Sequence, residues 1–352
     1  MKITVLLNLI FVAALSAQSR LSVHGHLSQA YAFTDGTEFL GIPKNGTTDY
    51  RNLALQFGYD MTDNTRLIIQ LGHKRLGTSP TMAFRDELEV DWAFVDYWLL
   101  DNVALKAGKV QLSMGIFNEI RDVGTLLPFY RVPFYTYNEG WWTSATVDGL
   151  VMSAYLRRSE PWNLEVHSFY GGWSLAELEG LLPSSARAED GLGVQVWLNT
   201  AIPGLRFGLE GHRVSFEGTN PDPNSSTSTT WTASIDGSFD RVIAQAEYIS
   251  NGFRTGSWCG YYARLGARLT DRLTINGLGD FGKLDLDMTL QSVTYHVELD
   301  NKDYALSLNY RLQSYLVLKF EHHWTKGISN PQNIFETPED VRYGILSFSA
   351  SF

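Results

Sequence analysis

The sequence predicts an all-β protein, a closed transmembrane barrel of sixteen antiparallel strands. Segments of about ten residues with alternating apolar and polar side chains recur along the chain, as in strands with lipid on one face and water on the other. The connections between them alternate between short and long. The chain also ends on such a segment, where serines separate the apolar residues Leu346, Phe348, Ala350 and Phe352.

The first residues have the composition of a cleaved export sequence. Lys2 gives a positive charge, residues 3–15 are mainly apolar, and small residues follow. This stretch is too short to remain as a membrane helix. We expect a signal peptide over residues 1–19, cleaved between residues 16 and 19, and one barrel domain over residues 20–352. Export followed by strand insertion predicts the outer membrane of a Gram-negative bacterium.

The composition restricts the class of protein further. The net charge of -10 argues against a nucleic-acid partner, which requires a basic face. Cys259 is the single cysteine, so an internal disulfide cannot form. The chain contains 13% aromatic residues and 31 glycines, which suit interfacial girdles and tight turns.

The sixteen predicted strands follow one another without a composition break that would divide the chain into domains. They cover residues 21–33, 50–60, 65–76, 87–99, 103–113, 145–157, 162–171, 190–200, 205–216, 229–239, 241–250, 259–270, 272–282, 302–312, 314–325 and 341–352. Short connections with turn-forming residues, such as 61–64 and 201–204, alternate with long polar ones, such as 34–49 and 326–340. This rhythm is typical of barrels with short periplasmic turns and longer extracellular loops.

The faces of the strands show where water must lie. In the segment over residues 314–325, Leu318 and Phe320 alternate with Lys319 and Glu321. A charge facing lipid at mid-bilayer costs roughly 2–4 kcal/mol, so these charges are expected to face a wet lumen. We expect the same alternation in residues 87–99, with Trp92 on the face opposite the acidic side chains. The predicted lumen wall contains charges of both signs, among them Lys106, Glu89, Asp91, Arg264, Arg268 and Arg311.

The connection over residues 114–144 is too apolar for an exposed loop. Its last part is an aromatic patch that contains Phe134, Tyr135, Tyr137, Trp141 and Trp142. A loop of this composition needs a surface on which to pack, and the inside wall of its own barrel is the nearest one.

This connection and its flanks resemble the large sixteen-stranded bacterial porins, particularly those near the phosphate-selective porins. The resemblance rests on residues 106–109, 115–119, 121–122, 128–131 and 147–149, and on Gly25 and Phe352 near the two ends. It implies a third loop that folds into the lumen and narrows the pore. The charges that it implies for the constriction are Glu119, Arg121, Asp122, Arg131 and Glu139.

One departure from the family pattern concerns the solute. The phosphate-selective members carry lysine-rich constrictions, whereas residues 114–144 contain no lysine. Phosphate selectivity is therefore not supported. The resemblance also implies a homotrimer, and residues 147–156, which are apolar on both faces, suit a strand covered by the loop inside and by a neighbouring subunit outside.

The chemistry-bearing residues form no convincing catalytic or metal-binding set. His24 and His26 share a strand face but lack a third ligand, and Asp285 and Asp287 are expected in a solvated outer loop. No Gly-x-Ser-x-Gly motif is present. We expect no enzyme and no cofactor.

The predicted function is therefore that of a porin, a channel for passive diffusion of small hydrophilic solutes or ions. Its expected partners are these solutes, the lipid and lipopolysaccharide of the outer membrane, and its own copies. The alternatives are a barrel that is not a channel, such as an adhesin, a binding protein or a barrel enzyme, and a secreted soluble β-sandwich, which would turn its apolar faces inward.

Overall fold

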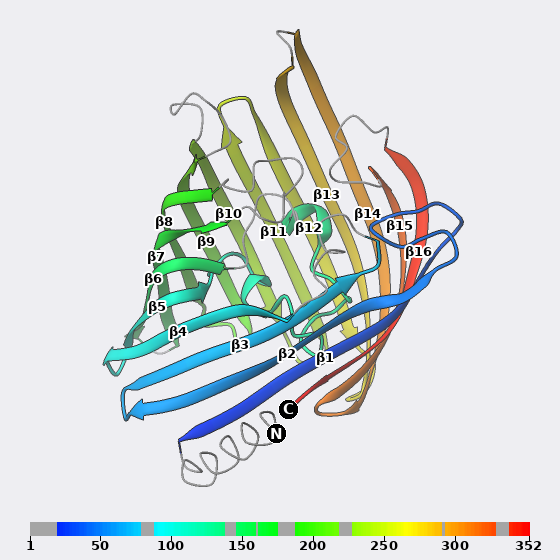
Figure 1. Ribbon diagram of the computed structural model, residues 1–352. Coiled ribbons are helices and arrows are strands. Elements are labelled where there is room, and N and C mark those ends of the chain that lie inside the picture. Colours follow the sequence, from blue (N-terminus) through cyan, green and yellow to red (C-terminus); the bar gives the residue numbers. More distant parts are fainter. Residues whose placement is uncertain are drawn as a thin grey trace, which may run out of the picture.

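The strands close into one barrel. The computed structural model describes residues 20–78, 88–137, 146–159, 161–174, 187–217, 227–290, 293–328 and 338–352. Each strand pairs antiparallel with its sequence neighbours, and β1 pairs with β16 to close the ring (Figure 1). The prediction of a sixteen-stranded antiparallel barrel is confirmed. The predicted signal peptide lies outside the described residues.

The strand bounds agree with the predicted segments over most of the chain. The strands are β1 (Leu21–Thr34), β2 (Thr47–Thr62), β3 (Thr65–Leu76), β4 (Glu89–Leu100), β5 (Val103–Gln111), β6 (Thr146–Ser159), β7 (Trp162–Ser174), β8 (Arg187–Asn199), β9 (Leu205–Glu217), β10 (Thr227–Ser238), β11 (Val242–Phe253), β12 (Gly256–Arg268), β13 (Leu273–Leu290), β14 (Val293–Gln313), β15 (Leu316–Gly327) and β16 (Glu339–Ser351). Two short helical turns, η1 (Asn118–Ile120) and α2 (Phe134–Tyr137), lie between β5 and β6.

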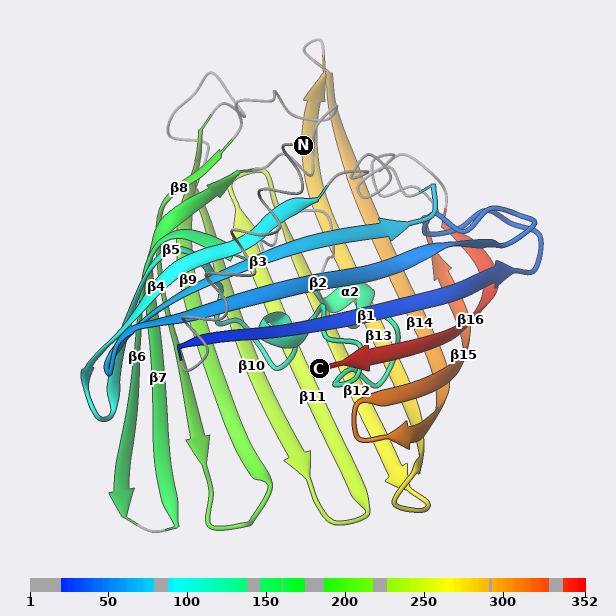
Figure 2. The ribbon, with the colours of Figure 1, turned by 60° about the horizontal axis from the view of Figure 1, so that its bottom comes forward.

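The end of the chain forms the seam of the barrel. The backbone N–H of Phe352 donates to the carbonyl of Gly25, and the reverse bond forms as well, both at 3.0 Å. A Cβ at position 25 would lie 2.7 Å from the Phe352 ring, so glycine leaves room for the terminal aromatic side chain. The short turns that join β8 to β9, β10 to β11 and β12 to β13 lie together at one rim (Figure 2).

The two faces of the wall differ in polarity as the alternation predicts. On β14 and β15, Leu306 and Phe320 are about half exposed on the outer face. Ser307, Lys319 and Glu321, on the opposite face, are 2% exposed or less. On these two strands the inner face is therefore polar and the outer face apolar, which is the reverse of a soluble β-sandwich.

The predicted facing of β4 is wrong in part. A register shift between β3 and β4 follows the pair Gln70–Trp92 and places Asp91 in a bulge. Because a bulge adds one residue to a strand, the alternation changes there. Trp92 and Phe94 are therefore buried on the inner face, the same face to which Asp91 points.

The short-long rhythm of connections also fails at two places. Only residues 254 and 255 separate β11 from β12, and only residues 291 and 292 separate β13 from β14. Asp285 and Asp287, expected in an outer loop, lie instead on β13, paired with β14. The two strands continue to pair beyond the apolar part of their outer face. A strand pair in water is held by backbone hydrogen bonds and needs no lipid-facing side chains.

A large apolar cluster fills part of the interior. It joins residues of the β5–β6 connection, such as Met114 and Phe117, to inward side chains of β4 to β9, such as Val151, Phe169 and Trp197. This packing explains the inward apolar side chains of Val147 and Val151 on β6, which lie beneath the connection. Within the described residues, no helix has the length and apolar character needed to cross a membrane.

Candidate functional site

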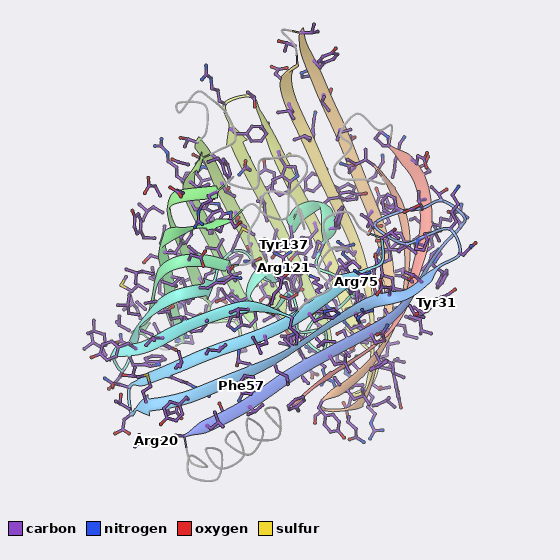
Figure 3. All side chains as sticks on the ribbon, in the orientation of Figure 1. Arg20, Tyr31, Phe57, Arg75, Arg121 and Tyr137 are labelled. Carbon is purple, nitrogen blue, oxygen red and sulfur yellow. The ribbon has the colours of Figure 1, made fainter. Side chains whose placement is uncertain are left out.

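The described part of the β5–β6 connection, residues 112–137, is the candidate functional site. Arg121 and Tyr137 of this segment lie within the ring of strands, whereas Tyr31 and Phe57 lie on the outer face of the front wall (Figure 3). The segment forms polar contacts with inward side chains of strands on several sides of the barrel. Among the described residues, Gln195 of β8 donates to the Gly115 carbonyl at 3.3 Å, and four larger groups of contacts also hold the segment.

The carboxylate of Glu247, on β11, is the first of these. It accepts hydrogen bonds from the backbone N–H of Ile116 at 2.7 Å and from the hydroxyl of Tyr262 at 2.8 Å. Ser234 donates to it at 2.6 Å, and the Tyr137 hydroxyl donates as well. A buried carboxylate is tolerated only when its oxygens are satisfied, and this one is satisfied by the connection and the wall together.

Two residues of the connection, Tyr137 and Gly115, complete its contact with Glu247. The Tyr137 hydroxyl accepts from the backbone N–H of Phe117 at 2.8 Å while it donates to Glu247. Burial, followed by the charge of Glu247, raises the pKa of the Tyr137 phenol well above its usual value, so the phenol remains a donor. Gly115 has φ of +57°, and a Cβ there would lie 2.6 Å from both Glu247 Oε1 and the Tyr137 hydroxyl.

The second group holds the start of α2. Asp280, on β13, accepts from the backbone N–H groups of Tyr135 at 2.8 Å and Thr136 at 3.0 Å, and from the Thr136 hydroxyl at 2.6 Å. These N–H groups belong to the first turn of α2 and have no partner within the helix. The wall therefore provides the acceptor for this short helix.

Glycines on neighbouring strands allow α2 to approach the wall. A Cβ on Gly260 of β12 would lie 2.6 Å from the Cα of Thr136, and one on Gly282 of β13 would lie 2.9 Å from the Cβ of Tyr135. On β15, a Cβ on Gly327 would lie 2.1 Å from the Tyr135 hydroxyl. Side chains at these positions would displace the helix.

The third group lies on β14 and β15. Ser307 and Asn309 donate to the carbonyl of Pro128, both at 2.9 Å. Lys319 donates to the carbonyl of Phe129 at 3.0 Å. Pro128 has no N–H, and its carbonyl lies outside regular secondary structure. Side chains of the wall therefore donate to a carbonyl that the loop itself does not satisfy.

The fourth group lies on the strands near the seam. Asn52 of β2 donates to the Asp122 carboxylate at 2.9 Å, and Lys74 of β3 forms an ion pair with it at 3.3 Å. Thr125 donates to Ser351 of β16 at 3.1 Å. Residues 112–137 are thus fixed to both the β1–β3 side and the β11–β15 side of the barrel.

No protein-family model and no curated protein matches the sequence, whereas many solved structures match its architecture. The outer membrane channel DcaP of Acinetobacter baumannii superposes with a TM-score of 0.61 at 9% identity, over 94% of this chain and 97% of DcaP. An anion-selective porin from Comamonas acidovorans gives 0.61 at 8% identity, over 94% and 99%. OmpF of Salmonella typhi, in complex with daunomycin, gives 0.63 at 9% identity, over 94% and 97%.

The chain has the fold of bacterial outer-membrane porins. The porin resemblance was inferred from the β5–β6 connection, which is the third of the long connections. It is confirmed at the level of the fold. In this porin fold, residues 112–137 are the described part of the third connection.

The charges expected at the constriction lie in different surroundings. Glu119 is exposed, and its carboxylate accepts from the Ser113 hydroxyl at 3.2 Å. Arg121 is buried and donates to the Asn118 side chain at 2.9 Å. Asp122 is fixed to the wall as described above.

The two remaining charges of that set lie later in the connection. The Arg131 guanidinium lies 4.8 Å from the centre of the Phe134 ring. Glu139 lies outside the described residues. The structure thus places Glu119 with access to solvent, while Arg121 and Asp122 pack against the protein.

The charges predicted for the lumen wall belong to inward positions. Lys106 pairs with Asp96 in register and lies 5.6 Å from the centre of the Phe94 ring. Glu89 is opposite Gly72, and Asp91 accepts from Gln70 at 3.2 Å. The remaining three lie on β12 and β14: Arg264, Arg268 and Arg311.

Sequence reasoning missed Glu247 and Asp280 as the groups that hold the connection. Both are charged residues in the middle of an alternating strand, and this was the available indication that they face inward. Which inward carboxylate meets the loop depends on barrel stagger, which the sequence pattern does not provide. Among the described residues, no group of three or more His, Cys, Asp or Glu side chains is arranged to hold a metal ion.

Proposed function

We propose that the protein is an outer-membrane porin that allows passive diffusion of small hydrophilic solutes or ions. The observation that carries this proposal is a closed barrel with an apolar outer face, a polar inner face and a connection attached to the inner wall. A polar interior in contact with water gives solutes a path, while the apolar face suits lipid. The DcaP and anion-selective porin structures support the same assignment through their fold.

We further propose that the third connection narrows this channel and contributes to its ion selectivity. Charges at a narrow, poorly hydrated passage act strongly on passing ions because the field is focused there. Glu119 is the best placed of the predicted charges, since it is exposed, and Arg121, Asp122, Arg131 and Glu139 complete the proposed set. Mixed charges on the wall, such as Lys106 and Asp91, would modulate the field.

Localisation follows from the same argument. We propose export through the signal peptide of residues 1–19 and insertion into the outer membrane of a Gram-negative bacterium, with the short turns on the periplasmic side. The long hairpin of β13 and β14 would then reach outward, toward lipopolysaccharide.

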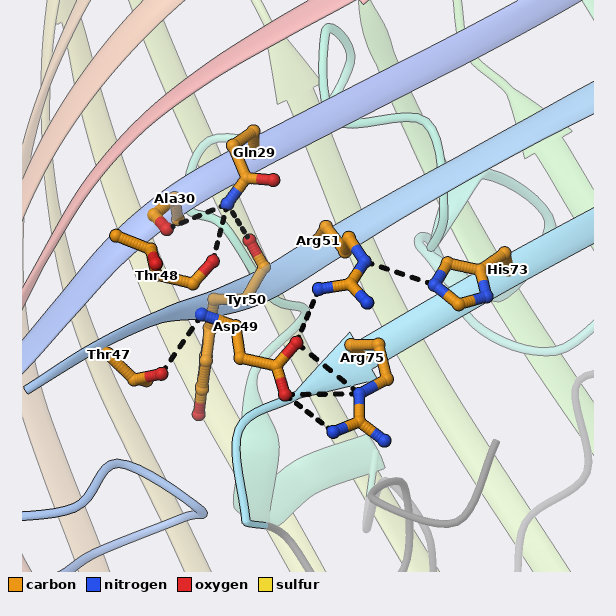
Figure 4. A network of polar contacts seen from close by, with 9 residues as sticks. All are labelled: Gln29, Ala30, Thr47, Thr48, Asp49, Tyr50, Arg51, His73 and Arg75. Atoms are coloured by element: carbon orange, nitrogen blue, oxygen red, sulfur yellow. Dashed lines mark hydrogen bonds and ion pairs between the residues drawn. The ribbon is translucent and has the colours of Figure 1, made fainter. Parts of the chain in front are cut away.

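Assembly as a homotrimer is supported by an unusual outer surface on β1–β3. Tyr50 and Asn52 contact the third connection inside the barrel, so Arg51 between them points outward. There Asp49 forms ion pairs with Arg51 and Arg75, and Arg51 donates to His73 at 3.0 Å (Figure 4).

Charges are costly against lipid, so a neighbouring subunit or the headgroup layer must cover this outer network. A trimer form is known for the similarly folded OmpT of Vibrio cholerae. We therefore propose that β1–β3 lie at a subunit contact. Mass measurement in mild detergent tests this assembly, and a monomer alone would contradict it.

Conductance in planar lipid bilayers tests the channel itself. The purified protein is expected to give discrete, ohmic conductance steps, and reversal potentials in a salt gradient would give its ion preference. A folded barrel that inserts without conductance would contradict the porin proposal and favour a barrel that acts as a binding protein.

A further inference from the structure

A cavity of about 300 Å³ lies between the third connection and the wall, near the rim of short turns. Its roof is formed by Thr125, Leu126, Leu127 and Pro128 of the connection. The remaining walls come from β10–β15 and from the turn between β12 and β13. This volume is at the lower end of the range for small-molecule sites, roughly 300–1,000 Å³.

The charges that line this cavity are strongly unbalanced. Four arginines line it, Arg264, Arg268, Arg272 and Arg311, against one carboxylate, that of Asp271. Asp236, on β10, does not line the cavity; it is paired with Arg206 at 2.9 Å and accepts from Gln245 at 2.8 Å. With four arginines against one carboxylate, the lining carries an excess of positive charge.

The partners of these arginines are neutral where they exist. Arg264 is 8% exposed and donates to the side-chain oxygens of Gln245 at 2.6 Å and Asn276 at 2.7 Å. Its Nε has no acceptor among the described residues. Arg268 donates to the Asp240 carbonyl at 2.8 Å and the Ser238 hydroxyl at 3.0 Å, and none of these acceptors is charged.

Arg272 and Arg311 have the greatest freedom to bind a ligand. The backbone N–H of Arg311 donates to the carbonyl of Arg272 at 2.7 Å, which brings the two residues side by side on adjacent elements. Neither guanidinium forms a hydrogen bond or ion pair within the part of the chain that the structure describes. Both line the cavity, with Asn309 and Thr274 as neutral polar neighbours.

We propose that this cavity, defined by Arg264, Arg268, Arg272 and Arg311, is a binding site for small oxyanions that cross the channel. Guanidinium groups present paired N–H donors that match the oxygens of phosphate and carboxylate groups. The confined positive field attracts anions and lowers the entry of cations at this rim. This site is separate from the third-loop charges, so the absence of lysine in that loop does not argue against it.

The inference rests on the proposed channel function only for its role in transport, and binding can be tested separately. Titration calorimetry with inorganic phosphate on the full-length protein in detergent is expected to show saturable binding. Arg272→Ser combined with Arg311→Ser should weaken the affinity about tenfold, through loss of two charge-assisted contacts. The matched control is Arg20→Ser with Arg241→Ser, which removes two exposed charges that do not line the cavity.

The same proteins are then compared in bilayers. Phosphate should reduce the chloride current of the wild type and of the control, and the half-blocking concentration should rise about tenfold in the cavity variant. Absence of phosphate binding, or equal weakening in both variants, would overturn the oxyanion site. Binding without any conductance would overturn the channel function and leave the site intact.

Discussion

Tyr137 donates its hydroxyl hydrogen to the carboxylate of Glu247, although 110 positions separate the two residues in the chain. The same hydroxyl accepts from the backbone of Phe117. One phenol therefore joins two parts of the third connection, Phe117 and α2, to the barrel wall. This bond makes the position of the connection a property of the folded barrel rather than of the loop alone.

Replacing Tyr137 with Phe should loosen the connection without unfolding the barrel. The change leaves the Phe117 N–H without its acceptor and removes one donor from buried Glu247. We expect the free energy of unfolding in urea to fall by about 1–3 kcal/mol. Open-channel current noise should also increase. Tyr304→Phe, at an exposed outer-face position, is the control, and equal stability of the two variants would contradict this role.

Gly115 should be irreplaceable for a different reason. Its positive φ disfavours a side chain, and a Cβ would collide with Glu247 Oε1. We expect Gly115→Ala to displace the connection and change the single-channel conductance while circular dichroism remains that of a β-barrel. Gly252→Ala provides the control, because a Cβ there meets no atom within 4 Å. Unchanged conductance in Gly115→Ala would show that this contact does not set the passage.

The strands could be predicted from the sequence because lipid and water impose opposite preferences on alternate residues. The prediction for residues 65–76 matches β3 at both ends. The prediction fails where alternate residues do not differ in polarity. Asp285 of β13 pairs with Glu298 of β14, whereas these charged stretches were predicted to be loops. The prediction also fails at Asp91. A bulge there does not change the alternating composition of the strand, but it turns Trp92 to the inner face.

The site was predictable only in outline. The aromatic content of residues 114–144 indicated a loop that needs a surface, and Met114 and Phe117 do pack against the inner wall. The contacts that fix it, from Asp280 and Lys319, depend on which inward residues of distant strands reach the same height. That height is set by strand tilt and stagger, which alternation does not encode.

The outward network on β1–β3 gives a test of assembly. Asp49→Ala would leave Arg51 and Arg75 without their shared carboxylate on the outer face. If that face is a subunit contact, unneutralised charges there should weaken the trimer by roughly 1–3 kcal/mol per contact. Mass measurement across a detergent dilution series should then show more monomer than for Asp63→Ala, an exposed carboxylate in a short turn. Identical mass profiles would place the contact elsewhere.

The third connection offers a matched pair of acidic residues that separates a selectivity role from a structural one. Glu119 is exposed, whereas Asp122, three positions later, is fixed by Asn52 and Lys74. A carboxylate that is already paired contributes less to the field felt by passing ions than one open to water. Glu119→Gln should therefore shift the reversal potential toward anions, with a change of about twofold in the permeability ratio.

Asp122→Asn should have the complementary effect. It removes the same charge but breaks the Lys74 ion pair, so we expect a smaller shift in reversal potential and a loss of about 1 kcal/mol in the free energy of unfolding. Arg121→Ser with Arg131→Ser tests the basic charges in the same way and should shift permeability toward cations. If Asp122→Asn shifts selectivity as much as Glu119→Gln does, solvent access is not what determines the contribution of these charges. If neither variant changes the ion preference of an intact barrel, the loop charges only fix the loop, and selectivity must arise on the wall.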